Sequence, residues 1–343
     1  MGPEMTLRSV LKSTAPSIAR YSGIAVTLAR RYSGPGIIFV LHSVGHSFFP
    51  DELLSCPLSV LENALLWFKR NSIRVVSLDE AVSRLEASAT DQFCVITFDD
   101  GFADNLTHAL PLMERYEAPF TVYVANGMLT GEIDAWWLGL VKLIRIRDHL
   151  EFPELGLRFD CAAPLSKKQT FNRVRAIIEA NWEAALGPIR ATIRANGIDP
   201  PALARVIGLS TEQLQQLADS PFVTIGAHGV RHINLARASA DEVEEEMAAS
   251  RRLLQDIIGR EVKHFAYAFG ACGPREAQIA KRLGFRTAVT LQHGTLFSQH
   301  ANHLHELPRE PLDRTDTPSS LRCKLAGIYR AYYSTFGEPV AHL

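Results

Sequence analysis

The chain lacks a long uninterrupted hydrophobic run: no stretch of about 18 apolar residues occurs among its 343 residues. A transmembrane helix is therefore not expected. The chain also lacks an excess of charge of either sign, because 36 basic and 37 acidic residues leave a formal net charge of −1. Without a strongly charged surface, binding to nucleic acid or to an anionic membrane through a global electrostatic field is not expected.

Cysteine is scarce as well, and its spacing excludes the patterns of a cysteine-rich metal site. The five cysteines lie far apart and form neither a CxxC pair nor a Cys/His cluster. Reduced thiols are therefore expected, which favours a cytoplasmic protein. The cysteines are Cys56, Cys94, Cys161, Cys272 and Cys323.

The N-terminus resembles an export signal only loosely. Residues 21–29 are weakly apolar and follow basic residues, but small and polar residues interrupt them, and Arg30 and Arg31 come directly afterwards. We expect a surface helix within residues 5–31, with a peripheral membrane contact through this helix as the alternative. The predicted location is accordingly cytoplasmic or membrane-peripheral.

Short apolar runs alternate with amphipathic stretches along most of the chain. The runs are continuously apolar and include many β-branched residues, which is typical of parallel strands covered on both faces. Such an alternation predicts an α/β fold, either a parallel barrel or a doubly wound sheet, with functional residues at the C-terminal strand ends. The predicted strands are 36–41, 74–78, 93–98, 120–124, 223–227, 264–267 and 287–291, and the predicted helices include 58–71, 104–116, 240–258 and 275–283.

The alternation stops between residues 126 and 221, a gap of about 95 residues that is too long for an ordinary crossover. Helical patterns at 169–185 and 210–218 predict a helical insertion over about 127–220. The predicted organisation is therefore an N-terminal helical segment over 1–35, a main domain over 36–310 that carries the insertion, and a C-terminal tail over 311–343.

Two adjacent carboxylates, Asp99 and Asp100, follow the apolar run 93–98 in the sequence TFDDG. Asp-Gly is a common turn dipeptide, so a simple turn is one interpretation. Neighbouring residues on an extended backbone point in different directions, so the alternative is that one carboxylate binds a cation while the other faces substrate.

The sequence HGVRH places His228 and His232 directly after the predicted strand 223–227. Two imidazoles at i and i+4 lie on one face of a helical turn and could present two nitrogens to one metal ion, although a chance pair is the competing interpretation. One carboxylate and two histidines would leave coordination positions open for water and substrate, as a hydrolytic metal site requires. The second carboxylate would then be free to act as a base.

Aromatic residues occur in two further segments with candidate roles. In FAYAFG, residues 265–270, a backbone N–H near Phe269 could stabilise an oxyanion, and Tyr267 is a candidate for substrate binding; a core strand ending in a glycine turn is the alternative. Trp136 and Trp137 open the insertion. Because adjacent tryptophans are not expected both to face one core, one of them could stack on a sugar, whereas the alternative is burial against the barrel.

TFDDG, IGAH-x3-H and FAYAFG, in this order and spacing, resemble the motifs of the polysaccharide deacetylases of carbohydrate esterase family 4, the NodB-homology group. The resemblance runs from about residue 36 to residue 309 and includes the opening GIIFVLHSVG, the linking stretch 235–259 and the late LPR at 307–309. It implies a distorted (β/α)7 barrel and one divalent metal ion, usually zinc, with cobalt, nickel and manganese as alternatives.

Transferred to this chain, the resemblance implies that Asp99 is the catalytic base and that Asp100, His228 and His232 bind the metal ion. It also implies that the amide of Phe269 stabilises the oxyanion. Arg309, within HELPREP, could orient the base through a charge-assisted hydrogen bond or could tie a surface loop.

The sequence departs from the family pattern at three places. Gly229 stands where the family usually has Ser or Thr, and Ala268 stands where proline is common. The late Leu-x-His motif, whose histidine serves as the general acid, has no clean match. His293, in TLQHG, and His42, in VLHSVG, are the two candidates for this role.

The predicted reaction is the metal-dependent hydrolysis of N-acetyl groups on an N-acetylhexosamine-containing poly- or oligosaccharide, with release of acetate. Two alternatives stay open: a cyclic-amide hydrolase of the same superfamily and a carbohydrate-binding protein that has lost catalysis. The sequence gives no indication of the oligomeric state.

Overall fold

The computed structural model describes residues 32–45 and 55–331. The predicted surface helix and its membrane contact fall on residues 5–31 and lie outside the described residues. Within the described part, no helix is both long enough and apolar enough to cross a bilayer.

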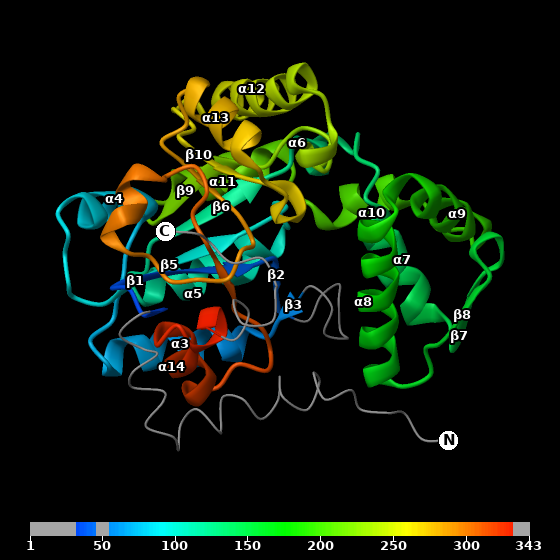
Figure 1. Cartoon of the computed structure of the whole chain (residues 1–343), viewed down its shortest axis with the longest axis horizontal. Coiled ribbons are helices and arrows are strands. Elements are labelled where there is room, and N and C mark those ends of the chain that lie inside the picture. Colours follow the sequence, from blue (N-terminus) through cyan, green and yellow to red (C-terminus); the bar gives the residue numbers. More distant parts are fainter. Residues whose placement is uncertain (1–31, 46–54, 332–343) are drawn as a thin grey trace.

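Parallel strands form the centre of the molecule (Figure 1). They run in the order β11-β10-β9-β6-β5-β1-β12, all neighbours pair in parallel, and β4 pairs with the first two residues of β5. Every residue of β1 and β5 is buried, as their continuous apolar sequences predict. The strands are β1 (Gly36–Leu41), β4 (Arg74–Val75), β5 (Phe93–Phe98), β6 (Phe120–Val124), β9 (Val223–Ala227), β10 (His264–Ala266), β11 (Thr287–Val289) and β12 (Glu310–Pro311).

The segment 307–312 joins the two ends of this sheet. The amide of Thr290, just after β11, donates to the carbonyl of Leu307, and the amide of Leu312 donates to the carbonyl of Val40 in β1. The strands thus curl round into a distorted barrel, which confirms the predicted fold class.

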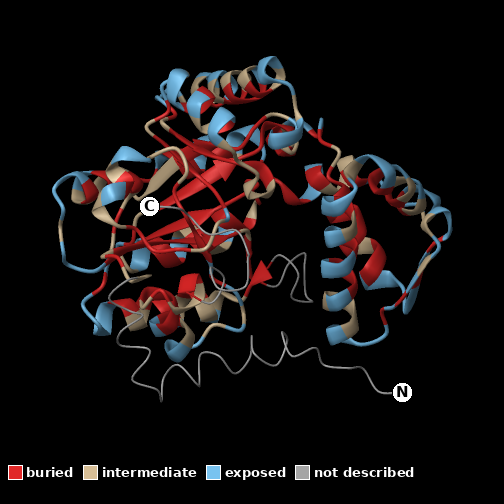
Figure 2. Ribbon diagram, in the orientation of Figure 1, coloured by how far each residue is buried: buried red, intermediate tan, exposed pale blue. Residues whose placement is uncertain are grey.

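Helices cover the outside of the barrel, with their outer sides exposed and the strands buried (Figure 2). Helix α12 shows how the sequence sets such a helix: Ser239 accepts the amide of Glu242 at its start, and Gly259 ends it with a φ of 65°. The covering helices are α3 (Leu58–Arg70), α4 (Leu78–Glu86), α5 (Leu110–Arg115) after a π-helical turn (Asn105–Ala109), α11 (Thr211–Asp219), α12 (Ala240–Ile258), α13 (Pro274–Arg282) and α14 (Pro318–Leu325).

The insertion lies beside the barrel and has its own hydrophobic core (Figure 1). It is not wholly helical, because it contains an antiparallel hairpin, and the helix predicted over 169–185 is broken at Asn181, whose side chain caps the next helix. Its elements are α6 (Asn126–Thr130), α7 (Trp136–Ile146), β7 (His149–Phe152), β8 (Leu157–Asp160), α8 (Pro164–Ala180), α9 (Trp182–Ala195) and α10 (Pro200–Ile207).

The described part of the predicted C-terminal tail, residues 311–331, is not a loose extension. Its helix α14 packs against α3, and Leu321 and Leu325 are buried in the main core. The ammonium group of Lys324 is buried and lies 2.6 Å from both carboxylate oxygens of Asp316. This segment therefore belongs to the folded barrel.

His300, in the short 3-10 helix Ser298–Asn302, is buried, so its protonation at low pH is expected to destabilise the fold. The residue is 1% exposed, and Nδ1 accepts the amide of Phe297. Burial, together with the nearby charge of Arg330, lowers the pKa of His300 to about 4. A histidine whose pKa is lower in the folded state gives full stability above its unfolded pKa of about 6.5 and loses it as the pH falls towards 4.

We expect wild type to lose on the order of 2 kcal/mol more unfolding free energy between pH 7 and pH 4.5 than His300→Asn, which accepts the same amide without titrating. Urea unfolding of both proteins at the two pH values measures this difference. An equal loss in both proteins would show that His300 does not titrate in this way.

Candidate active site

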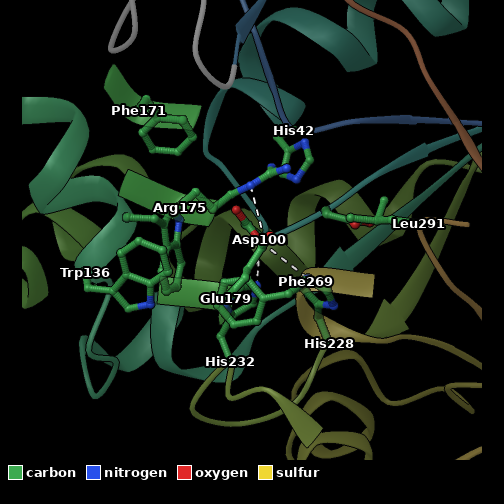
Figure 3. Close-up of a pocket in the computed structure, with 12 residues that line it drawn as sticks. His42, Asp100, Trp136, Phe171, Arg175, Glu179, His228, His232, Phe269 and Leu291 are labelled. Carbon is green, nitrogen blue, oxygen red and sulfur yellow. Dashed lines mark ion pairs between the residues drawn. The ribbon is translucent and has the colours of Figure 1, made fainter. Parts of the chain in front are cut away.

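The C-terminal ends of the parallel strands open into a cavity of about 220 Å³. Residues that follow β1, β5, β9, β10 and β11 line the side formed by the barrel, and α7 and α8 of the insertion line the other side. Figure 3 shows Asp100 at the centre of the labelled side chains, with dashed lines to both histidines. The cavity is lined by His42, Asp99, Asp100, Trp136, Trp137, Phe171, Arg175, Glu179, His228, His232, Phe269 and Leu291.

Asp99 and Asp100 follow β5 at a tight turn. Asp100 has a φ of 71° and Gly101 one of 84°, so two successive residues adopt the left-handed conformation. A side chain at Gly101 would meet Val124 at 3.0 Å. Both interpretations of the Asp-Gly sequence are therefore compatible with the structure, since the turn itself directs two buried carboxylates into the cavity.

Arg309 binds Asp99 with both ends of its guanidinium group. Nη1 and Nη2 each donate to one carboxylate oxygen at 2.7 Å, Nη1 also donates to Thr97 Oγ1 at 3.1 Å, and Nε donates to the carbonyl of Thr290. Arg309 is fully buried, so the structure places it at Asp99 rather than on a surface loop. Burial alone would raise the pKa of Asp99, but the charge of Arg309 holds this pKa below its ordinary value.

His228 and His232 do not lie on a helical turn, contrary to the prediction. His228 directly follows β9, and the chain then loops back through Gly229 and His232, whose φ values are 81° and 53°. Glycine suits position 229 because of this φ, and a Cβ there would also lie 3.2 Å from Glu246 Oε2. The imidazoles converge because the loop is tight, and not because a helical turn places them on the same face.

Hydrogen bonds from two helices hold the backbone of this loop. The amides of Asn126 and Gly127, in α6, donate to the carbonyls of Gly229 and Val230 at 3.0 and 2.8 Å. On the other side, Glu246 Oε2 of α12 accepts the amides of Val230 and Arg231 at 2.9 and 3.0 Å. The histidine loop is therefore clamped between α6 and α12.

Asp100, His228 and His232 form a buried group whose three potential ligand atoms all lie within 4.8 Å of one another. Asp100 Oδ1 lies 3.4 Å from Nε2 of His228 and 3.3 Å from Nε2 of His232. A tetrahedral zinc ion with bonds of about 2.0–2.1 Å separates its ligand atoms by about 3.3–3.4 Å. This donor set therefore fits a divalent metal ion.

Hydrogen bonds and burial set the charges of this group. His228 Nδ1 donates to the carbonyl of Ala266 at 2.7 Å, which orients the ring with Nε2 towards Asp100. Burial opposes charge on His228, but its hydrogen bond to Asp100 raises the pKa of this imidazole. Burial opposes charge on Asp100, but hydrogen bonds from the two histidines hold its pKa well below the ordinary value. Burial lowers the pKa of His232, which favours the neutral imidazole that a metal ion needs.

Phe269 follows β10 with a φ of 60°, a strained conformation for a bulky residue. Among the described residues, no acceptor within hydrogen-bonding distance takes its amide hydrogen. Ala268, which departs from the family pattern, lies at the start of the same 3-10 turn. An unpaired amide beside a metal-ligand group is suited to an oxyanion.

Trp136 and Trp137 are both buried and both line the cavity, so the expectation that they could not share one core is wrong. The ring of Trp136 stacks on Phe269 at 6.0 Å with an interplanar angle of 18°. Tyr267 is placed elsewhere: it is buried in the main core, and its hydroxyl donates to the carbonyl of His305. Tyr267 therefore has no place among the substrate-binding candidates.

Of the two candidate general acids, His42 lines the cavity that contains Asp99 and Asp100, and His293 does not. His42 lies directly after β1 and lines the same cavity as Asp99 and Asp100. His293 lines the adjoining cavity of about 350 Å³, to which His42 also contributes, and its Nδ1 lies 2.9 Å from Glu310 Oε2.

Several residues of the site went unrecognised in the sequence. Glu246 gave a signal, because it interrupts the apolar stripe of α12 that includes Val243 and Met247. Arg175 and Glu179 of α8 gave no such signal in the sequence, because exposed charges at i and i+4 on a helix are common. In the structure, their side chains pair at 3.2 Å and line the cavity.

Comparison with known proteins places this geometry in a family. The model of the polysaccharide deacetylase family matches residues 86–288, more than half of the chain. The Bacillus subtilis (strain 168) protein named "Putative polysaccharide deacetylase YxkH" is 18% identical over 251 residues, which cover 73% of this chain and 63% of that protein. The chain thus spans less than two thirds of the length of this relative.

Solved structures share the fold at low sequence identity. The Streptococcus pyogenes deacetylase PplD in complex with acetate is similar with a TM-score of 0.58, 17% identity, and coverage of 85% of this chain and 99% of that chain. BC0361, a polysaccharide deacetylase from Bacillus cereus, gives a TM-score of 0.55 with 14% identity over 85% and 69% of the two chains. The match to the family model, on a barrel whose strand ends gather these carboxylates and histidines, shows that the chain belongs to the polysaccharide deacetylase family.

Proposed function

We propose that this protein hydrolyses the N-acetyl group of an N-acetylhexosamine unit in a poly- or oligosaccharide and releases acetate. The observation that carries the proposal is the convergence of Asp100, His228 and His232 beside Asp99, a second carboxylate that Arg309 holds by two hydrogen bonds. Three ligands with an open side, next to a separate base, are the arrangement that metal-assisted hydrolysis of an amide needs.

Asp100, His228 and His232 would hold one divalent ion, with zinc as the first candidate and cobalt, nickel and manganese as the alternatives. When bound, this ion would polarise the acetyl carbonyl and make water more acidic. Asp99 is ionised and oriented by Arg309, so it can accept the proton of the attacking water. The unpaired amide of Phe269 can donate to the carbonyl oxygen as negative charge develops on it.

The leaving amine needs a proton, and we assign this step to His42. Of the two candidates, His42 lines the cavity that holds the base and the proposed metal ligands, whereas His293 lines the adjoining cavity and is held by Glu310. A proton donor has to be within reach of the nitrogen that leaves. His293 would then line the adjoining cavity without taking part in the proton transfer.

The aromatic wall supports a saccharide as the substrate. Trp136 and Trp137 of the insertion and Phe269 of the barrel line the cavity with their rings in contact, and aromatic rings pack well against the apolar faces of pyranoses. Arg175 and Glu179 add polar groups at the rim from α8. The cytoplasmic or membrane-peripheral location expected from the sequence stays a prediction.

Acetate release from N-acetylglucosamine oligomers, with and without a chelator, tests the reaction. The same assay tests the assignment of the acid: His42→Asn should lower kcat by about a hundredfold, as expected when a general acid is lost, and His293→Asn should keep most of the activity. A large loss in His293→Asn together with an active His42→Asn would reverse the assignment.

A further inference from the structure

The structure orients the two proposed histidine ligands in different ways. The ring of His228 is held by a hydrogen bond from Nδ1 to the carbonyl of Ala266. The corresponding Nδ1 of His232 is buried and has no hydrogen-bond partner among the described residues. Ligating histidines almost always use such a hydrogen bond to set the ring orientation, so His232 needs another restraint.

Aromatic rings surround His232 in place of that hydrogen bond. The ring of Trp137 lies against the imidazole, with the centroids 4.3 Å apart and an interplanar angle of 40°. Phe269 contacts the imidazole edge-on at 4.7 Å. Because the loop backbone is clamped between α6 and α12, rotation of the side chain is the main freedom left to His232, and these two rings limit it.

Trp137 is itself firmly placed, because α7 is the central helix of the insertion. Eight residues of this helix are buried, and the helix packs against α8, α9 and α10. Gly139, two residues further along, leaves so little space that a Cβ there would meet Ile193 and Pro200 at 2.8 Å. The indole is therefore a rigid surface that the insertion presents to the barrel.

We propose that Trp137 is a positioning residue of the metal centre, which keeps the ring of His232 turned so that Nε2 faces Asp100. The insertion would thus complete the metal site as well as form a wall of the cavity. This inference rests on the proposed metal site, but its test uses metal binding alone and needs no substrate.

The test is the affinity for Co²⁺ and Zn²⁺, measured by competition with a chromogenic chelator on folded protein. Trp137→Ala is expected to bind both ions about 10–100-fold more weakly, the usual cost of losing a group that orients a ligand. Its Co²⁺ absorption spectrum should also change, because one nitrogen ligand is no longer held in place. Trp137→Phe, which keeps a ring against the imidazole, should recover most of the affinity and the wild-type spectrum.

Trp182→Ala is the matched control. Trp182 belongs to the same aromatic cluster and contacts Trp136 and Phe269 at 6.1 and 5.5 Å, but the described contacts of its ring do not include His232. This variant should bind metal as wild type does. If Trp137→Ala fails to fold, Trp137→Leu replaces it, because leucine fills part of the space without a flat face.

Two outcomes would overturn the inference: a folded Trp137→Ala or Trp137→Leu with wild-type affinity and spectrum, or a Trp182→Ala that weakens binding equally. Wild-type protein that binds metal in a Trp137-dependent way but releases no acetate would contradict the proposed function and leave this inference standing.

Discussion

Replacing Asp99 by Asn is expected to lower kcat by about a thousandfold, because an amide cannot accept the proton of the attacking water. The side chain keeps its size, and its carbonyl oxygen can still accept a hydrogen bond from Arg309. Metal affinity should be retained, since Asp100, His228 and His232 are unchanged. Steady-state acetate release and chelator competition on the same preparation measure both quantities.

The control for this variant is Asp79→Asn. Asp79 also pairs with an arginine, Arg286, which precedes β11 and so lies at the opposite end of the strands from the cavity. Loss of this partly exposed pair should leave kcat near the wild-type value. If Asp99→Asn turns over at a rate similar to Asp79→Asn, Asp99 is not the base.

Replacing His228 by Ala is expected to abolish metal binding and to lower activity by at least about a thousandfold, because several kcal/mol of charge stabilisation are lost with the ion. Only Asp100 and His232 would remain, which is fewer protein ligands than catalytic zinc sites use. Dialysis of wild type against a chelator should give the same inactive state, and added Zn²⁺ should restore wild type but not the variant.

His303→Ala serves as the control for the loss of a histidine, because this exposed side chain pairs with Glu306 and lies outside the cavity. It should bind metal and release acetate as wild type does. Full activity of chelated wild type, or recovery of His228→Ala by Zn²⁺, would contradict the metal assignment.

The strands and most covering helices could be predicted because their signals are local. Continuous apolar runs occur where a strand is buried on both faces, and α12 carries its cap, its amphipathic stripe and its terminal glycine within its own sequence. The hairpin β7–β8 could not be predicted, because each strand has only four residues. This is too short for their alternation between exposed and buried positions to be recognised.

The site was only partly accessible from the sequence, since its geometry depends on tertiary contacts. The spacing of His228 and His232 suggested a helical turn, but residues of α6 and α12 hold these histidines in a left-handed loop instead. The pairing of Asp99 with Arg309 joins residues 210 positions apart, which no local pattern specifies. The resemblance to a known family supplied what periodicity could not.

In the proposed reaction, a metal ion held by Asp100, His228 and His232 would allow Asp99 to direct water at an N-acetyl group. The most direct measurement quantifies acetate and free amino groups in parallel when Zn²⁺-loaded protein acts on an N-acetylglucosamine oligomer. We expect both products to appear in equal amounts with wild type, and neither to appear after chelation or with Asp99→Asn. Binding of the oligomer by the metal-loaded wild-type protein without release of acetate would contradict it and would identify a saccharide-binding protein instead.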